Sequence, residues 1–196
     1  MARVRAACAR LPAPTRPDEI PVRARAAAVL LAIFEEDGEA RLILTKRPAS
    51  MPSHQGEIAF PGGKFEPGVD ADLAATARRE ADEEVGLDPG SIEIVGELDT
   101  LVTVAGRFLL TPFVGLVPTR PVLRPDPSEV DVVFDVALRE LLADGVHHEE
   151  VWDRPGDVAG ERTIQFFDLE TETVWGATAR VLVGFLEALT ATPSGP

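Results

Sequence analysis

Three glutamates in the middle of the chain have the spacing of a metal site. Glu80, Glu83 and Glu84 stand at i, i+3 and i+4, so on a helix their carboxylates project from one face. Hard divalent cations take oxygen ligands, and Mg²⁺ is commonly held by one or two carboxylates together with water and substrate phosphates. The spacing therefore predicts a metal site for phosphate chemistry, with a solvated acidic helix face as the alternative.

The helix that carries these acids is predicted from about Asp72 to Val85. Asp70 or Asp72 can cap its start, and Gly86, followed by the turn sequence Asp-Pro-Gly, stops it. A stripe of small apolar residues allows the helix to lie close to a sheet. This stripe comprises Leu73, Ala74, Ala77, Ala81 and Val85.

A glycine pair precedes the helix. Ile58 to Phe60 is predicted as a strand that leads into Pro61-Gly62-Gly63. Because glycine lacks Cβ, its backbone can turn sharply and approach an oxyanion. A lone glycine pair is more often a plain turn, but its place before an acidic helix leads us to expect Gly62 and Gly63 to bind a pyrophosphate.

These residues resemble a known family. Arg79 to Leu87, READEEVGL, is similar to the second half of the Nudix box, G-x5-E-x7-R-E-U-x-E-E-x-G-U, in which U is aliphatic. Between Gly63 and Arg79 there are two residues more than the pattern has, and Ala71 stands where an acid is expected. Three acids lie near that position, namely Glu66, Asp70 and Asp72.

The resemblance implies a Nudix hydrolase with Mg²⁺ or Mn²⁺ as cofactor. Glu80, Glu83 and Glu84 are then the metal ligands and catalytic residues, while Arg79 and Gly86 support the site. We expect Arg79 to orient the glutamates rather than to contact the substrate.

The segment from Leu44 to Gly63, LTKRPASMPSHQGEIAFPGG, is similar to the motif that precedes the box in coenzyme A diphosphatases. Pro48 and Pro52 depart from that motif, and Pro52 replaces an arginine, which removes a cation that could meet phosphate. The subgroup resemblance covers about 25–142 and implies coenzyme A as substrate, cleaved to 3′,5′-ADP and 4′-phosphopantetheine. Its matching residues are Leu44, Thr45, Arg47, Gly56, Phe60, Pro61, Gly62 and Gly63.

Three further residues are candidates for the site. Arg47 is expected to bind substrate, and His54, in the loop before the glycines, could contact substrate or act as a base. Glu129, just before a predicted strand, is a candidate general base or additional metal ligand. A surface histidine and a solvated strand-end acid are the plain alternatives.

Composition favours one globular domain. The chain has 196 residues, 45% of them hydrophobic, which suits a single core. The order of predicted elements indicates a mixed α/β (α+β) Nudix-type fold, with a mixed sheet between helices. We expect an Arg- and Pro-rich lead-in at 1–25, the Nudix domain at 26–190 and a flexible tail at 191–196. A hairpin is predicted from Ala26–Phe34 and Arg41–Lys46, an edge or bulge at Thr111-Pro112, and a helix cap at Asp135.

Charge and cysteine content limit the partners. A formal net charge of −14 argues against nucleic acid or an anionic membrane. The single cysteine, Cys8, and the absence of a long apolar run favour a cytoplasmic protein. The family resemblance also makes a homodimer a candidate assembly.

The sequence thus predicts a metal-dependent pyrophosphohydrolase whose leading substrate is coenzyme A or a derivative. One alternative is a Nudix hydrolase of ADP-ribose, NADH or other nucleotides. Another is a catalytically inactive Nudix module that binds a nucleotide, although three intact glutamates favour an enzyme.

Overall fold

The fold is built on an eight-stranded mixed sheet and a separate three-stranded antiparallel sheet. It is seen in a computed structural model that describes residues 1–50, 55–103, 107–152 and 161–191. The main sheet comprises β1 (Arg25–Glu36), β2 (Glu39–Lys46), β3 (Ile58–Ala59), β4 (Gly62–Lys64), β5 (Glu93–Glu97), β6 (Leu101–Val102), β7 (Phe108–Leu116) and β8 (Val132–Ala137). The second sheet comprises β9 (His147–Trp152), β10 (Arg162–Asp168) and β11 (Thr173–Trp175). The helices are α1 (Ala2–Cys8), α2 (Leu73–Val85), α3 (Leu138–Leu141) and α4 (Gly176–Thr190), with a 3₁₀ turn, η1 (Pro89–Ser91).

The centre of the main sheet is β1, a twelve-residue strand. It forms the predicted hairpin with β2 across Asp37-Gly38, where both residues have positive φ, 52° and 78°, as a two-residue hairpin turn requires. On its other side β1 runs parallel to β7. The first half of β1 pairs instead with β4, so that Ala28 lies opposite Gly63. This change of partner brings the glycine pair into the sheet.

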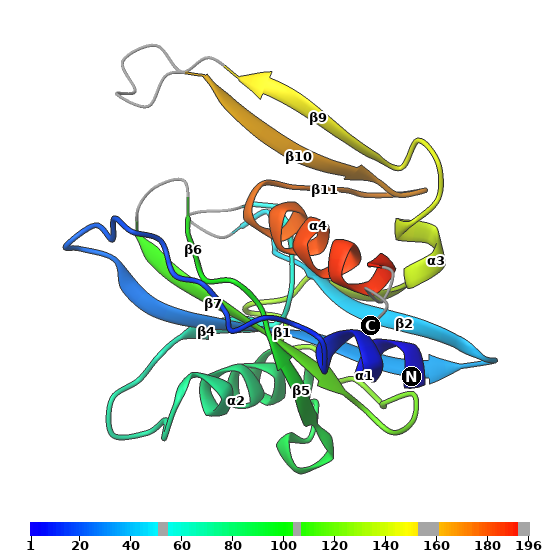
Figure 1. The fold of residues 1–196 in the computed structure, drawn as a ribbon. Coiled ribbons are helices and arrows are strands. Elements are labelled where there is room, and N and C mark those ends of the chain that lie inside the picture. The colour runs from blue at the N-terminus through cyan, green and yellow to red at the C-terminus, as the bar shows by residue number, and fades with distance from the viewer. Residues whose placement is uncertain (51–54, 104–106, 153–160, 192–196) are drawn as a thin grey trace.

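Successive side chains of β1 point to opposite faces of the sheet and so belong to two separate core layers. Ala28, Leu30, Ala32 and Phe34 pack with the small residues of α2, whereas Val29, Leu31 and Ile33 belong to the cluster that includes α1 and α4. In Figure 1, α2 lies on one side of the sheet and α4 on the other. The prediction of a mixed sheet between helices is confirmed.

The N-terminal helix α1 packs into the core. Val4, Ala7 and Cys8 are buried in the same cluster as α4, and Arg5 pairs with Glu93. The arginines of α1 therefore lie on the face of the sheet opposite α2. None of the helices in the described part of the chain is long and apolar enough to cross a membrane.

Three local predictions are wrong. Gly62 and Gly63 lie in strand β4 rather than in a turn, because their backbone pairs with β1. Pro112 lies inside the sheet, since β7 pairs with β1 on one side and with β5 and β6 on the other. Asp135 lies in β8 and pairs with Arg41 and Arg120, so it does not cap α3, whose first residue is Leu138.

Candidate active site

The helix α2 is fixed at both ends by the predicted capping residues. The carboxylate of Asp72 accepts a hydrogen bond from the Ala75 amide at 2.7 Å, and Gly86 ends the helix with a left-handed φ of 70°. The Gly86 N–H donates to Asp82 O at 2.7 Å. Ala77 and Ala81 are fully buried against the sheet, which brings the glutamates of the same helix close to β4.

Glu84 is buried against the first glycine of β4. Its side chain accepts a hydrogen bond from the Gly62 N–H at 3.1 Å, and only 5% of the residue is exposed. Burial raises the pKa of Glu84 to about 8; the Gly62 amide and Arg47 oppose the rise, and the carboxylates of Glu80 and Glu129 add to it. Glu80, Glu129 and Arg47 therefore lie close enough to Glu84 to interact with its charge.

Glu80 lies against the second glycine of β4. A Cβ placed on Gly63 would overlap the Glu80 carboxylate, so only glycine leaves room for this carboxylate beside the strand. The pKa of Glu80 is raised first by burial and further by Glu83 and Glu129, while Arg79 lowers it. Glu80 and Glu84 thus present neighbouring carboxylates to adjacent residues of one strand.

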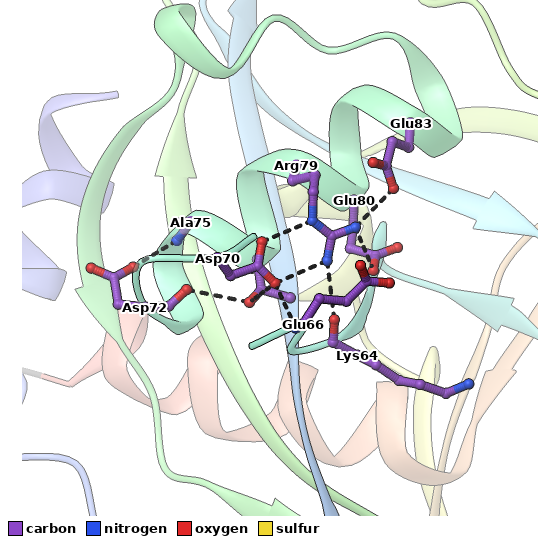
Figure 2. Close-up of polar contacts among 9 residues, drawn as sticks. Lys64, Glu66, Asp70, Asp72, Ala75, Arg79, Glu80 and Glu83 are labelled. Atoms are coloured by element: carbon purple, nitrogen blue, oxygen red, sulfur yellow. Dashed lines mark hydrogen bonds and ion pairs between the residues drawn. The ribbon is translucent and has the colours of Figure 1, made fainter. Parts of the chain in front are cut away.

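Arg79 connects the helix to the preceding loop, as Figure 2 shows. Its Nη1 lies 2.8 Å from a Glu83 oxygen and 3.0 Å from a Glu80 oxygen. Its Nη2 donates to the Lys64 carbonyl at 3.1 Å. Because one guanidinium contacts both glutamates, it can hold their carboxylates in place.

Asp70 holds Arg79 from the other side. Its two carboxylate oxygens accept hydrogen bonds from Arg79 Nε at 2.8 Å and Nη2 at 3.0 Å, a bidentate pair. The Thr76 hydroxyl and the Glu66 amide each donate to Asp70 at 2.9 Å. These bonds, led by the one from Arg79, hold the pKa of Asp70 well below its usual range.

Sequence reasoning left the role of Asp70 open, because three acids lie near the position where the pattern expects one. The structure separates them, since Asp72 caps the helix and Asp70 binds Arg79. The side chain of Asp70 is 2% exposed, so this carboxylate requires the partners that it has. In the sequence, the feature that could have identified Asp70 as this partner is Arg79, nine residues later.

The remaining predicted residues are placed as follows. The Arg47 amide donates to Glu57 O at 3.1 Å, and the Arg47 carbonyl accepts from Gly56 N at 3.1 Å. The segment that carries Glu129 is joined to the end of α2, because Asp126 N donates to Glu84 O at 2.9 Å. His54 and Pro52 lie outside the described residues.

The neighbouring histidines of β9 are remote from this cluster. His147 bonds Gln165 at 2.6 Å, and His148 stacks on Phe166 with ring centroids 5.1 Å apart. Both contacts lie within the three-stranded sheet. These contacts give both histidines a structural role within that sheet.

The cluster beside β4 has the chemistry of a site for a hard divalent cation. Its possible ligand atoms are all carboxylate oxygens. Glu80 and Glu129 raise the pKa of Glu84, and Glu83 and Glu129 raise the pKa of Glu80, a repulsion that a cation would relieve. Within the described ranges, no group of three or more His, Cys, Asp or Glu residues is already arranged around a metal position. The Glu83 carboxylate pairs with Arg79, and its side chain is 59% exposed. Glu83 is therefore the most exposed of the three helix glutamates.

Comparisons with known proteins identify the family. The sequence model described as NUDIX domain matches residues 23–168, and the chain therefore belongs to this family. It is 38% identical over 168 residues to "Nudix hydrolase 22, chloroplastic" of Arabidopsis thaliana, covering 82% of this chain and 54% of that protein. It is 36% identical over 169 residues to "Uncharacterized Nudix hydrolase NudL" of Photorhabdus laumondii, covering 86% and 87%.

The fold is also shared with a solved structure. A MutT/nudix family protein from Enterococcus faecalis aligns with a TM-score of 0.56 and 14% identity, covering 87% of this chain and 64% of that one. The chain spans only about half of the Arabidopsis relative. The predicted Nudix superfamily is confirmed.

Proposed function

We propose that this chain is a Mg²⁺- or Mn²⁺-dependent pyrophosphohydrolase that cleaves the diphosphate of coenzyme A or a derivative. The observation that carries the proposal is the pair of carboxylates, Glu80 and Glu84, packed against Gly63 and Gly62 with Glu129 beside them. Nudix hydrolases generally use divalent metal ions, and this chain offers oxygen donors on the helix that the family pattern specifies.

Each residue of the cluster has a distinct part in the proposed reaction. Glu80 and Glu84 would hold the cation, with Glu83 joining them when its carboxylate turns away from Arg79. The Gly62 amide fixes one oxygen of Glu84, and Arg79 fixes Glu80. A bound cation supplies Lewis acidity, which promotes attack by water and stabilises the charge that gathers on phosphorus.

Proton removal from the attacking water requires a carboxylate base. Glu129 suits this role, because it is exposed and yet close enough to raise the pKa of both Glu80 and Glu84. The water oxygen bonds to one phosphorus, the bridging P–O bond breaks, and the leaving phosphate keeps the bridging oxygen. For coenzyme A the products are 3′,5′-ADP and 4′-phosphopantetheine.

Coenzyme A is the leading substrate because of the motif between Leu44 and Gly63, and the charge of Arg47 in that motif acts on Glu84. Its guanidinium opposes the pKa rise of Glu84, so it lies where a diphosphate beside Glu84 would meet it. Pro52 stands where the coenzyme A diphosphatase motif has an arginine, so ADP-ribose, NADH and other nucleotides are the competing substrates.

Product analysis by mass spectrometry tests the proposal. The protein is incubated with Mg²⁺ or Mn²⁺ and with coenzyme A, ADP-ribose, NADH and nucleotides, alongside Glu84→Gln and the control Asp82→Asn, which makes the same change at an exposed site on the same helix. We expect metal-dependent release of 4′-phosphopantetheine by the unmodified protein and Asp82→Asn, and loss in Glu84→Gln. Turnover of another compound alone would replace the substrate, and metal-independent binding without turnover would identify a non-catalytic nucleotide-binding module.

A further inference from the structure

The turn at residues 126–131 connects the end of α2 to the end of β2. At its start the Asp126 N–H donates to the Glu84 carbonyl at 2.9 Å. At its end the Asp131 N–H donates to the carbonyl of Lys46, the last residue of β2, also at 2.9 Å. The turn is therefore anchored on both sides, to the helix that carries the acidic cluster and to the main sheet.

Asp126 closes this turn with both its side chain and its main chain. Its Oδ1 accepts hydrogen bonds from the Ser128 N–H at 2.9 Å and from the Ser128 hydroxyl at 2.7 Å. Its carbonyl accepts from the N–H groups of Glu129 at 3.0 Å and Val130 at 2.9 Å. The residue types suit the turn, because Asp can bond the backbone two residues further on and Pro127 presets φ. One residue thus holds the backbone that carries Glu129.

Glu129 and Val130 differ in how their side chains are held. Val130 is 2% exposed and belongs to the core cluster of α2, whereas Glu129 is exposed. Because packing does not fix an exposed side chain, the backbone of the turn sets where the Glu129 carboxylate lies. That carboxylate acts on the charges of both Glu80 and Glu84. Its place beside the two helix acids therefore depends on the bonds of the turn.

We propose that Asp126 is a positioning residue for hydrolysis, because its side chain holds the turn that keeps Glu129 beside Glu80 and Glu84. The inference rests on the proposed function, in which Glu129 removes a proton from the attacking water. Such a base must lie within hydrogen-bond reach of the water, and a displacement of about 1 Å can slow a reaction about 100-fold. The Asp126 carboxylate bonds Ser128, so it acts through Glu129.

The pair Asp126→Ala and Asp126→Asn separates the hydrogen bonds from the charge. Both variants remove the same charge from an exposed position, but asparagine keeps an acceptor for Ser128. The assay is Mg²⁺-dependent hydrolysis of coenzyme A, or of the compound that product analysis shows to be turned over. We expect Asp126→Ala to lower kcat about tenfold with little change in KM or in Mn²⁺ affinity, because Glu80 and Glu84 are unaltered. Asp126→Asn should retain most of the activity.

A second comparison asks whether Asp126 acts through Glu129. If it does, Asp126→Ala should have little further effect on kcat in the Glu129→Gln background, because the residue that it positions is already inactive there. An equal fractional loss of kcat in both backgrounds would overturn the proposal. So would an equal loss in Asp126→Ala and Asp126→Asn, or an unchanged kcat in Asp126→Ala.

Amide hydrogen exchange, measured by NMR, tests the turn itself without metal or substrate. We expect the amides of Ser128 and Glu129 to exchange about tenfold faster in Asp126→Ala than in the unmodified protein, and at a nearly normal rate in Asp126→Asn. Unchanged exchange in Asp126→Ala, together with normal hydrolysis by the unmodified protein, would contradict this inference alone. Absence of hydrolysis by the unmodified protein would contradict the proposed function and, with it, the catalytic part of the inference.

Discussion

Replacing Glu84 with Gln tests the charge crowding beside Gly62. Glutamine keeps an acceptor for the Gly62 N–H but carries no charge. Burial raises the pKa of Glu84 from its ordinary 4.5 to about 8 in the folded protein. Between these values the folded protein holds a proton that the unfolded chain has released, so stability falls as the pH rises through this window.

The structure sets the size of this effect. At about 1.4 kcal/mol per pKa unit, full ionisation of Glu84 costs the metal-free protein at most about 5 kcal/mol. We therefore expect Glu84→Gln to be similar to the unmodified protein near pH 5 and more stable by a few kcal/mol above pH 8. The assay is urea denaturation with a chelator at several pH values, and each free energy of unfolding is compared with that of the unmodified protein.

The control for this experiment is Asp82→Asn, which removes an exposed carboxylate from the same helix. We expect its free energy of unfolding to follow the pH dependence of the unmodified protein. If Glu84→Gln did the same, Glu84 would titrate normally in the folded protein, and the description of a crowded, buried carboxylate would be refuted.

Three further changes probe the same cluster. Asp70→Asn leaves Arg79 without its buried carboxylate and should lower the free energy of unfolding by about 3 kcal/mol. The control Asp72→Asn keeps a capping acceptor and should change the free energy of unfolding little. Thermal and urea denaturation measure both variants. Gly63→Ala places a methyl group on the Glu80 carboxylate, so turnover should fall about 100-fold with little change in melting temperature. The control Gly184→Ala adds a Cβ that has no atom within 4 Å, and it should leave turnover unchanged. Glu129→Gln removes a carboxylate that raises the pKa of Glu84 in the folded protein, so the upper end of the pH window over which stability is lost should move to lower pH in the same urea assay.

Local signals predicted the acidic helix well. Asp72 and Gly86 act through bonds to residues within five positions of themselves, so their roles are readable from the sequence. The hairpin of β1 and β2 was predicted for the same reason, since its turn needs only Asp37 and Gly38.

Errors arose where distant segments decide the structure. Gly62 and Gly63 form a strand only because the first half of β1 offers them a partner. Asp135 is held in β8 by Arg41 and Arg120, which come from other parts of the chain. The three-residue strand β11 was not predicted, because it is too short to show a pattern and pairs with β10.

The site could be predicted only in part, because contacts between distant segments also determine its geometry. The spacing of Glu80, Glu83 and Glu84 gives the face of the helix, but not which carboxylates lie against β4. The pattern expects an acid at position 71, where this chain has alanine, and only the path of the folded loop shows that Asp70 is the acid that binds Arg79. The closeness of Glu129 to Glu84 depends on the backbone bond between Asp126 and Glu84, which no local pattern reveals.

The central claim is that Glu80 and Glu84, with Glu129 beside them, hold a divalent cation. Titration of Mn²⁺ followed by electron paramagnetic resonance measures this directly, because free Mn²⁺ gives a signal that binding removes. We predict saturable binding by the unmodified protein and by Asp82→Asn, and affinity weakened by about tenfold or more in Glu84→Gln. Equal Mn²⁺ affinity in the unmodified protein and Glu84→Gln would contradict the claim.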